Sequence, residues 1–142
     1  DDVVKLSSYL SLGAIPVMHA MPPYGLWEEP AEQGRIPPHR TDAGAYLTAE
    51  VLGAQTCILV KDERGLYTAD PKKDPQAEFI PEISVEELLR RDLNDLPVER
   101  SMLQALARAD TLAEVRMING LERGNLTRAL AGENVGTRIY KE

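Results

Sequence analysis

The sequence predicts a layered α/β fold. Helical and extended patterns alternate along the 142 residues, which is typical of sheets covered by helices. One extended segment, residues 56–60, is almost entirely apolar, as a parallel strand is when both of its faces are buried. This strand stops at a charged turn, and ligands of open α/β sheets bind where such strands end. Because no linker or internal repeat divides the chain, we expect one domain.

The first part of the chain is expected to hold a helix and a short strand. Apolar spacing predicts a helix over residues 2–11, which Gly13 would end. Residues 15–18 are expected to form a short buried strand, which Pro16 limits to an edge or a first position. The chain opens with Asp1 rather than Met, inside the expected helix, so we expect it to be part of a longer protein.

A long loop of unusual composition spans residues 19–40. It carries five of the ten prolines, the only tryptophan and both histidines, His19 and His39. Prolines prevent helix formation and ladder pairing, but Trp27 is not typical of a flexible linker. Two interpretations stay open, a functional loop and a structural loop that covers a sheet edge or docks a neighbouring subunit.

The middle of the chain contains two helix starts. A helix is expected over residues 41–53, with Thr41 or Asp42 as its cap. Residues 79–83 read as extended, and Ser84 with Glu87 forms a capping box that starts the next helix. The remaining elements are expected as a helix, a strand, a short helix and a last strand, over residues 98–109, 113–118, 126–131 and 136–140.

Charge and composition exclude several classes of protein. The chain has 16 basic and 23 acidic residues, a net charge of −7, and an acidic surface repels nucleic-acid phosphates. The single cysteine, Cys57, permits no intrachain disulfide, which fits a cytoplasmic setting. No apolar run approaches the ~20 residues of a membrane helix, and no signal peptide is visible.

Charged residues at the end of the central strand could bind a phosphorylated ligand. Lys61 follows the strand directly and can reach a phosphate oxygen, while Asp62 could hold Mg²⁺ through water. After Gly65, Tyr67 could stack on a base and Asp70 could accept hydrogen bonds from ribose hydroxyls. The alternative is a solvated turn, with Tyr67 packed beneath it and Asp70 capping the bend before a proline.

Three further positions carry weaker signals. Asp42 stands at an expected helix N-terminus, where anions gather, but it could equally cap that helix. His19 and His39 could bind a metal or an oxoanion, although their spacing matches no metal motif and a loop histidine is more often satisfied by ordinary hydrogen bonds. No Ser-His-Asp set, zinc set or Walker A loop is present.

Several motifs together resemble the C-terminal half of the amino acid kinase family, in the order found in bacterial uridylate kinases. They span residues 41–140 and comprise Thr41-Asp42-Ala-Gly-Ala, residues 61–71, Phe79-Ile80-Pro81-Glu-Ile83-Ser84, residues 118–126 and Gly132-Glu133-Asn-Val-Gly136-Thr137. The resemblance implies a mostly parallel three-layer α/β/α sandwich whose C-terminal half holds ATP. It makes Asp42 and Lys61 catalytic candidates. It also implies nucleotide contacts from Lys61, Asp62, Gly65, Leu66, Tyr67, Asp70, Pro71, Asn119, Gly136 and Thr137.

The proline-rich loop refines this resemblance. Together with residues 124–133, the segments Met21-Pro-Pro-Tyr-Gly-Leu-Trp27 and Arg35-Ile-Pro-Pro-His39 are similar to the molybdenum storage proteins of that family, and we expect the α-type subunit. The resemblance implies a heterohexameric cage with a homologous β-type subunit. It also implies ATP, Mg²⁺ and molybdate or tungstate held as polyoxometalate clusters, with His19 as the first expected cluster contact and His39 as the second.

The chain departs from the family pattern in two places. The proline-rich loop stands where uridylate kinases carry a glycine-rich phosphate-acceptor loop, and Pro97 stands where the family places a catalytic lysine. Phosphoryl transfer depends on such cationic groups. The family's first glycine-rich loop and N-terminal lysine would precede Asp1. A uridylate-kinase-like phosphotransferase and a nucleotide-binding scaffold without hydrolysis therefore remain alternatives.

Overall fold

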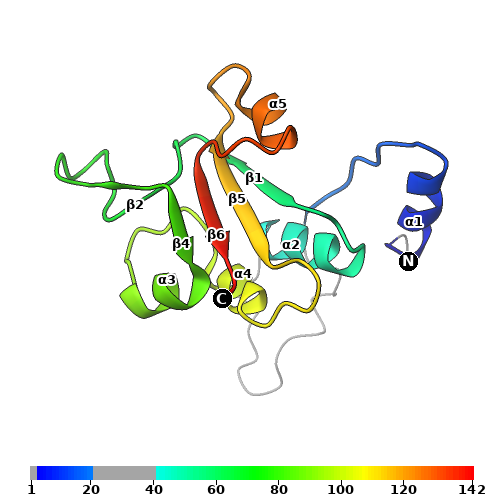
Figure 1. The fold of residues 1–142 in the computed structure, drawn as a ribbon, viewed down its shortest axis with the longest axis horizontal. Helices are drawn as coiled ribbons and strands as arrows, with labels where there is room; N and C mark the ends of the chain where they lie inside the picture. The colour runs from blue at the N-terminus through cyan, green and yellow to red at the C-terminus, as the bar shows by residue number, and fades with distance from the viewer. Residues whose placement is uncertain (1–2, 21–40) are drawn as a thin grey trace.

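A computed structural model describes residues 3–20 and 41–142 (Figure 1). Its elements, in chain order, are α1 (Val3–Ser11), α2 (Thr41–Val51), β1 (Cys57–Lys61), β2 (Leu66–Tyr67), β3 (Phe79–Ile80), β4 (Glu82–Ser84), α3 (Val85–Arg91), α4 (Arg100–Leu106), β5 (Glu114–Asn119), α5 (Asn125–Leu130) and β6 (Thr137–Tyr140). Expected and observed helices and strands agree over most of the described chain.

Four strands form the main sheet, in the order β1-β5-β6-β4. Strands β1 and β5 are parallel, as are β4 and β6, and the antiparallel pair β5–β6 joins them. The register places Lys61 opposite Asn119 at the carboxyl ends of β1 and β5. Since β6 runs the other way, its first residue, Thr137, starts near that same edge, opposite Met117. A mixed α/β fold with a mostly parallel sheet is therefore confirmed.

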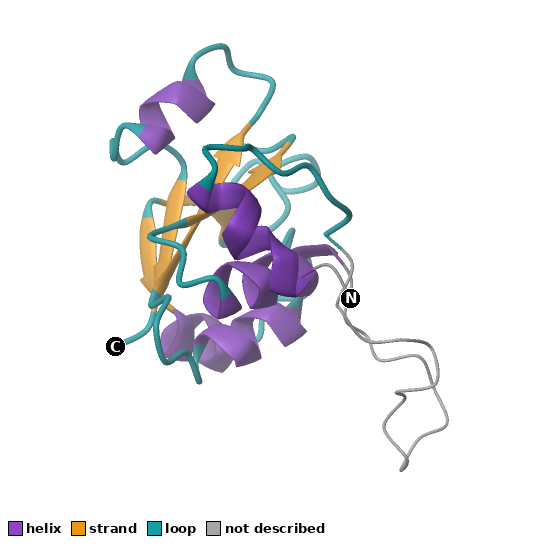
Figure 2. Ribbon diagram, turned by 90° about the vertical axis from the view of Figure 1, so that its right-hand side faces the viewer, coloured by secondary structure: helices purple, strands orange, loops and turns teal. Residues whose placement is uncertain are grey.

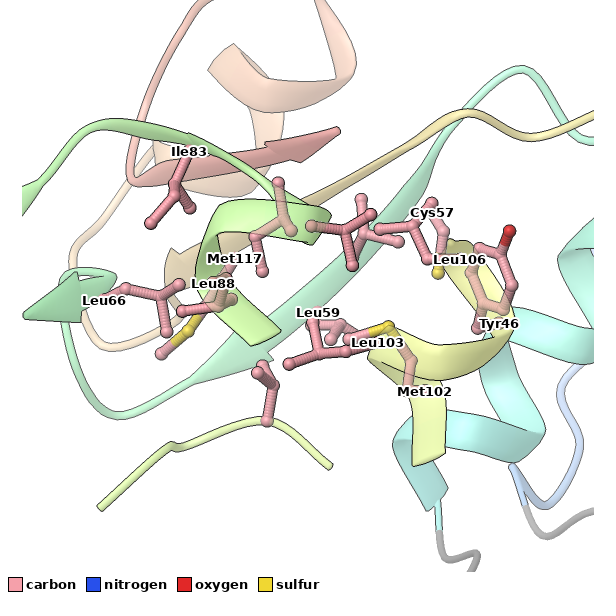
Figure 3. Packing of buried hydrophobic residues seen from close by; sticks show 14 of the residues in the cluster. Tyr46, Cys57, Leu59, Leu66, Ile83, Leu88, Met102, Leu103, Leu106 and Met117 are labelled. Carbon is pink, nitrogen blue, oxygen red and sulfur yellow. The ribbon is translucent and has the colours of Figure 1, made fainter. Parts of the chain in front are cut away.

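One face of the sheet is covered by α2, α3 and α4 (Figure 1). Alternate residues of each strand point to the same face, so Cys57 and Leu59 of β1 meet this helical layer. Large side chains such as Met102, Leu103 and Leu106 of α4 are fully buried against them (Figure 3). The packing is mostly aliphatic and sulfur-containing, and Tyr46 is the aromatic residue in this buried cluster.

The opposite face is covered in part, by the short helix α5. Ile118, Ala129 and Val135 form a second buried cluster there, with Ile58 packed against it. Figure 2 shows one short helix standing apart from the main helical group. Val60, by contrast, keeps 51% of its surface exposed. The expectation that residues 56–60 are buried on both faces is therefore wrong at Val60, because β1 is an edge strand of this sheet and α5 does not cover that residue.

The expected cap of α3 is present, whereas no cap by Thr41 or Asp42 is found at α2, whose first N–H groups bond to Glu99 instead. Ser84 Oγ accepts a hydrogen bond from the backbone N–H of Glu87 at 3.2 Å and starts α3. The α4 helix is shorter than the apolar face over residues 98–109 predicts. After it, the backbone N–H groups of Arg108 and Ala109 donate to carbonyls three residues earlier, as in a 3₁₀ turn. Ala109 is buried although it lies outside the helix.

The predicted strand at residues 15–18 is wrong. Residues 14–20 have no regular structure, and Ile15 and Val17 are 90% and 96% exposed. Pro16 lacks the N–H that a ladder needs, and no strand of the described chain pairs with this segment. The predicted helix before it is confirmed as α1, and Gly13 follows with a φ of 76°. The proline-rich segment 21–40, with Trp27 and His39, lies outside the described residues.

Within residues 3–20 and 41–142, no helix is both long and apolar enough to cross a bilayer.

Candidate functional site

The end of β1 meets the start of α2 through an ion pair. Lys61 Nζ lies 2.7 Å from Oδ1 and 2.9 Å from Oδ2 of Asp42. The Asp42 side chain is 8% exposed and that of Lys61 is 26% exposed, so solvent screens this pair less than a surface pair. The alternation of β1 explains the contact, because Lys61 follows Leu59 on the face that α2 and α4 cover. The two residues predicted to be catalytic therefore lie in direct contact.

Glu99, at the start of α4, completes this junction. Its carboxylate accepts hydrogen bonds from the backbone N–H groups of Asp42 and Ala43, each at 3.3 Å. In return, the N–H of Glu99 donates to Oδ2 of Asp42 at 3.3 Å. Glu99 thus caps the first turn of α2. The sequence left open whether Asp42 caps this helix, and in the structure Glu99 has that role. The carboxylate of Asp42 is directed to Lys61 and Glu99.

A cavity of about 760 Å³ opens beside this junction. Its wall brings together the ion pair and the segment leading into α4, and consists of Thr41, Asp42, Lys61, Leu96, Pro97, Val98, Glu99, Arg100, Ser101 and Gln104. Lys61 gives this cavity a cation, and a lysine ammonium binds phosphate or another oxoanion as a point charge. Arg100 is engaged elsewhere, since it pairs with Asp92 and donates to the carbonyl of Leu93 at 2.7 Å.

A second cavity, of about 270 Å³, lies next to the first and shares Leu96 and Pro97 with it. Four of the predicted nucleotide contacts line it, namely Gly65, Tyr67, Asp70 and Pro71. Its wall is completed by Glu63, Ala69, Lys72, Asp95, Leu96 and Pro97. The larger cavity is thus lined by the Lys61 ammonium and the smaller one by the ring of Tyr67, two groups that a phosphorylated ligand with a ring could contact.

Tyr67 and Asp70 have structural partners as well as a place in the cavity wall. The ring of Tyr67 meets Phe79 edge to face, with 5.5 Å between centroids. Asp70 accepts a hydrogen bond from the backbone N–H of Lys72 at 2.9 Å and pairs with Lys73 at 3.1 Å. The Lys72 N–H, followed by the Lys73 ammonium, holds the pKa of the Asp70 carboxyl below its usual range. Asp70 therefore caps the turn, as the structural alternative predicts, while one side of it faces the cavity.

Gly65, Leu66 and Thr137 form the interior support of this loop. A Cβ on Gly65 would lie 2.3 Å from Oγ1 of Thr137, so the glycine is required by close packing. That hydroxyl accepts from the N–H of Leu66 at 2.8 Å and donates to the carbonyl of Ile80. Leu66 and Thr137 are fully buried. The resemblance implies nucleotide contacts from both, but their side chains line neither of the two cavities and hold the loop in place.

Asn119 and Gly136 also have structural roles. Oδ1 of Asn119 accepts from the N–H of Leu121 at 2.8 Å, in the turn after β5. Gly136 has a φ of 79°, and a Cβ there would lie 2.0 Å from the carbonyl oxygen of Met117. Gly136 lines a separate cavity of about 390 Å³ next to Arg64 and Phe79. Neither residue lines the two cavities beside Lys61 and Tyr67.

Magnesium would need the help of a ligand's phosphates at this site. Among the described residues, no three His, Cys, Asp or Glu side chains group closely enough to hold a metal ion by themselves. Mg²⁺ is commonly held by one or two carboxylates plus substrate phosphates. Asp42 lies in the wall of the larger cavity, but both of its carboxylate oxygens contact the Lys61 ammonium. Asp62 lines neither cavity, and its side chain is 72% exposed and 3.5 Å from Lys72. A nucleotide's phosphates would therefore have to supply most of the ligands of a Mg²⁺ ion at this site.

His19 lies in a different part of the structure. It is exposed and lines an apolar cavity of about 570 Å³ between α1 and α2, with Leu6, Leu10 and Ala49. This cavity shares no residue with the two cavities described above. His39 falls outside the described residues.

Sequence reasoning missed the segment that forms the common wall of the two cavities. Residues 95–101 lie far from Lys61 in the chain, and only Pro97 stood out, as a departure from the family pattern. The sequence did contain one usable signal, which is that this segment leads into the helix predicted to start at residue 98. In sheets of parallel strands connected by helices, helix starts lie near the carboxyl ends of the strands. Glu99 had no recognisable motif, because its partners lie 56 and 57 residues away.

The fold and the paired cavities define an α/β protein with a candidate ligand site at the carboxyl edge of a mostly parallel sheet. The chain belongs to the amino acid kinase family, whose model matches residues 2–119. The family resemblance inferred from the motifs is thereby confirmed.

Two curated relatives and one solved structure give finer comparisons. The chain is 54% identical over 123 residues to the molybdenum storage protein subunit beta of Azotobacter vinelandii, covering 87% of this chain and 46% of that one. It is 32% identical to the uridylate kinase of Hyperthermus butylicus, covering 95% and 66%. The UMP kinase of Bacillus anthracis has the same fold, with a TM-score of 0.76 at 21% identity, covering 99% and 51%. The chain thus spans between about half and two thirds of the length of these proteins.

Proposed function

We propose that this chain is the nucleotide-binding part of a molybdenum storage subunit, which uses ATP to load molybdate or tungstate. The observation that carries the proposal is the 54% identity to a molybdenum storage protein subunit over most of the chain. The uridylate kinases match at 32% to 35%.

The proposed nucleotide position follows from the two cavities. Lys61 would bind the phosphates, since its ammonium is a cation in the wall of the larger cavity. Tyr67 would contact the base, and Asp70 would accept from the ribose hydroxyls. Mg²⁺, held by Asp42 or Asp62 together with the phosphates, would neutralise charge on the phosphate oxygens.

The metal oxoanions are the proposed cargo, stored as polyoxometalate clusters. His19 and His39 are the proposed cluster contacts, with His19 first. The proposed assembly is a heterohexameric cage built with a homologous subunit. The relative that supports it is named as a subunit beta, and the α-type interpretation of this chain therefore stays a prediction. A cytoplasmic location is part of the same proposal.

ATP-dependent loading of the full-length assembly tests the proposal directly. We expect molybdenum to remain with the protein after desalting when ATP and Mg²⁺ are supplied, and little to remain without ATP. Replacement of Lys61 by methionine, in an otherwise identical assembly, should reduce the retained metal. Equal retention with and without ATP would contradict the proposal.

A uridylate-kinase-like phosphotransferase is the second candidate, supported by a match over 95% of the chain. A coupled assay of ADP release with a panel of nucleoside monophosphates separates the two, because a storage protein should release ADP without dependence on an acceptor. Pro97, which stands in the cavity wall in place of the cation implied by the family resemblance, favours the storage function. Intact ATP recovered after long incubation would instead identify a scaffold subunit.

A further inference from the structure

Glu99 has an unusual position among the residues around Lys61. It is the N-cap residue of α4, but its side chain makes no capping hydrogen bond to α4. Both carboxylate oxygens are directed to another helix, α2, where they accept from the N–H groups of Asp42 and Ala43. The contact joins residues 56 and 57 positions apart, so it ties two helices together.

Glu99 and Asp42 each accept hydrogen bonds from the start of the other residue's helix. The N–H groups of a helix's first turn lack partners within the helix, and an aspartate in that turn ordinarily attracts them. Here Glu99 accepts from the first turn of α2, while Asp42 accepts from the N–H of Glu99 at 3.3 Å. Each carboxylate therefore caps the start of the other residue's helix.

This reciprocal capping determines which groups the Asp42 carboxylate contacts. Because Glu99 accepts from the Asp42 and Ala43 N–H groups, the Asp42 carboxylate is not needed by its own helix. Its two oxygens instead contact the Lys61 ammonium, at 2.7 and 2.9 Å. Without the Glu99 carboxylate, the two N–H groups of α2 would compete with Lys61 for Asp42.

We infer that Glu99 is a positioning residue. By capping α2 in place of Asp42, it keeps the Asp42 carboxylate on Lys61 and thereby fixes the ammonium at the wall of the larger cavity. Arg100, the other cation in that wall, is held by Asp92 and the Leu93 carbonyl and does not substitute for Lys61. The consequence for ATP rests on the proposed function, whereas the effect on Lys61 itself does not.

The test, in the full-length protein, compares Glu99, which binds the first turn of α2, with Glu50, a residue of the last turn of α2 whose side chain binds residues 110–112. Glu50 accepts from the backbone N–H groups of Asp110, Thr111 and Leu112, and has no contact with Asp42 or Lys61. Glu50→Gln is therefore the matched control for Glu99→Gln. We expect Glu99→Gln to weaken MgATP binding about fivefold to tenfold, the size of one lost capping interaction expressed as affinity. Glu50→Gln should lower the thermal midpoint and leave the affinity unchanged.

A second readout needs no nucleotide. The NMR signal of the Lys61 ε-methylene group, assigned by its loss in Lys61→Met, reports the surroundings of the ammonium. In Glu99→Gln it should move toward the position of an exposed lysine, and in Glu50→Gln it should stay in place. A Lys61 signal that is the same in the wild type and Glu99→Gln would overturn the inference, as would an unchanged affinity in a protein that binds ATP. Failure of the wild type to bind ATP would contradict the proposed function, and the NMR signal would still decide the role of Glu99.

Discussion

Lys61 and Asp42 are 19 positions apart in the chain, and their side chains meet at 2.7 Å between Nζ and Oδ1. The contact joins the carboxyl end of β1 to the first turn of α2. It places a cation and a nearly buried carboxylate in the wall of the larger cavity.

Removal of the Asp42 carboxylate should cost both stability and nucleotide binding. In Asp42→Asn the amide is neutral, so Lys61 loses its anionic partner while the backbone N–H of Glu99 keeps an acceptor. We expect a loss of about 1–3 kcal/mol in the free energy of unfolding, as for a partly buried charged hydrogen bond. Urea denaturation measures the change. Glu133→Gln, which breaks an exposed ion pair with Arg128, is the control and should change stability little.

Glu50 should make stability depend on pH. Burial alone would raise the pKa of Glu50, but hydrogen bonds from the backbone of Thr111, Asp110 and Leu112 outweigh burial and lower it. A carboxyl whose pKa is lower in the folded protein stabilises the fold above its unfolded pKa, and this stabilisation disappears as the pH falls through the folded pKa.

The measurement is the free energy of unfolding of the wild type and Glu50→Gln from pH 7 downward. The two curves should be separated at neutral pH and converge at acidic pH. Parallel curves over the whole range would show that the charge of Glu50 contributes nothing. At neutral pH we expect a difference of about 1 kcal/mol, as for a lost helix-cap or turn-cap hydrogen bond.

Gly65→Ala should disturb the loop that lines the smaller cavity. The added Cβ would lie 2.3 Å from Thr137 Oγ1 and 3.0 Å from the Thr137 backbone nitrogen, and this region is fully buried. We expect a loss of about 1–3 kcal/mol, typical of overpacking, with weaker nucleotide binding in the full-length protein.

Gly120→Ala is the matched control for that substitution. Its Cβ would also meet an atom at 2.3 Å, but this atom is Cγ1 of the half-exposed Val60, which can rotate away. Thermal unfolding of both variants compares the two sites. An equal loss of stability in the two would contradict the packing role of Gly65.

Cys57 should react slowly with alkylating reagents in the native protein. Burial raises the pKa of the Cys57 thiol to about 11, with a further contribution from the charge of Asp42. The thiolate is the reactive form, so reaction with iodoacetamide at pH 8 should be far slower in the native protein than in urea. Rapid modification of the native protein would contradict this burial. Stability should also decrease as the pH rises from the ordinary thiol pKa toward 11, because the unfolded thiol ionises first.

Local sequence patterns predicted most of the elements correctly. The capping box at Ser84 and Glu87, the helix after Thr41 and the apolar strand that ends at Lys61 all depend on neighbouring residues. The segment 15–18 was predicted incorrectly, since a short apolar run becomes a strand only when another strand pairs with it. Val60 shows the same limit, because its exposure depends on its place at the sheet edge.

The sequence by itself determined the fold class, the order of the elements and the position of Lys61 at the end of a strand. Periodicity and caps are local properties, and the chain expresses them through residues a few positions apart. Tertiary structure alone decided that Asp42 contacts Lys61, that Glu99 caps α2 and that Leu66 and Thr137 are joined in the interior. These contacts join residues 19 to 71 positions apart, and their geometry exists only after the helices have packed on the sheet.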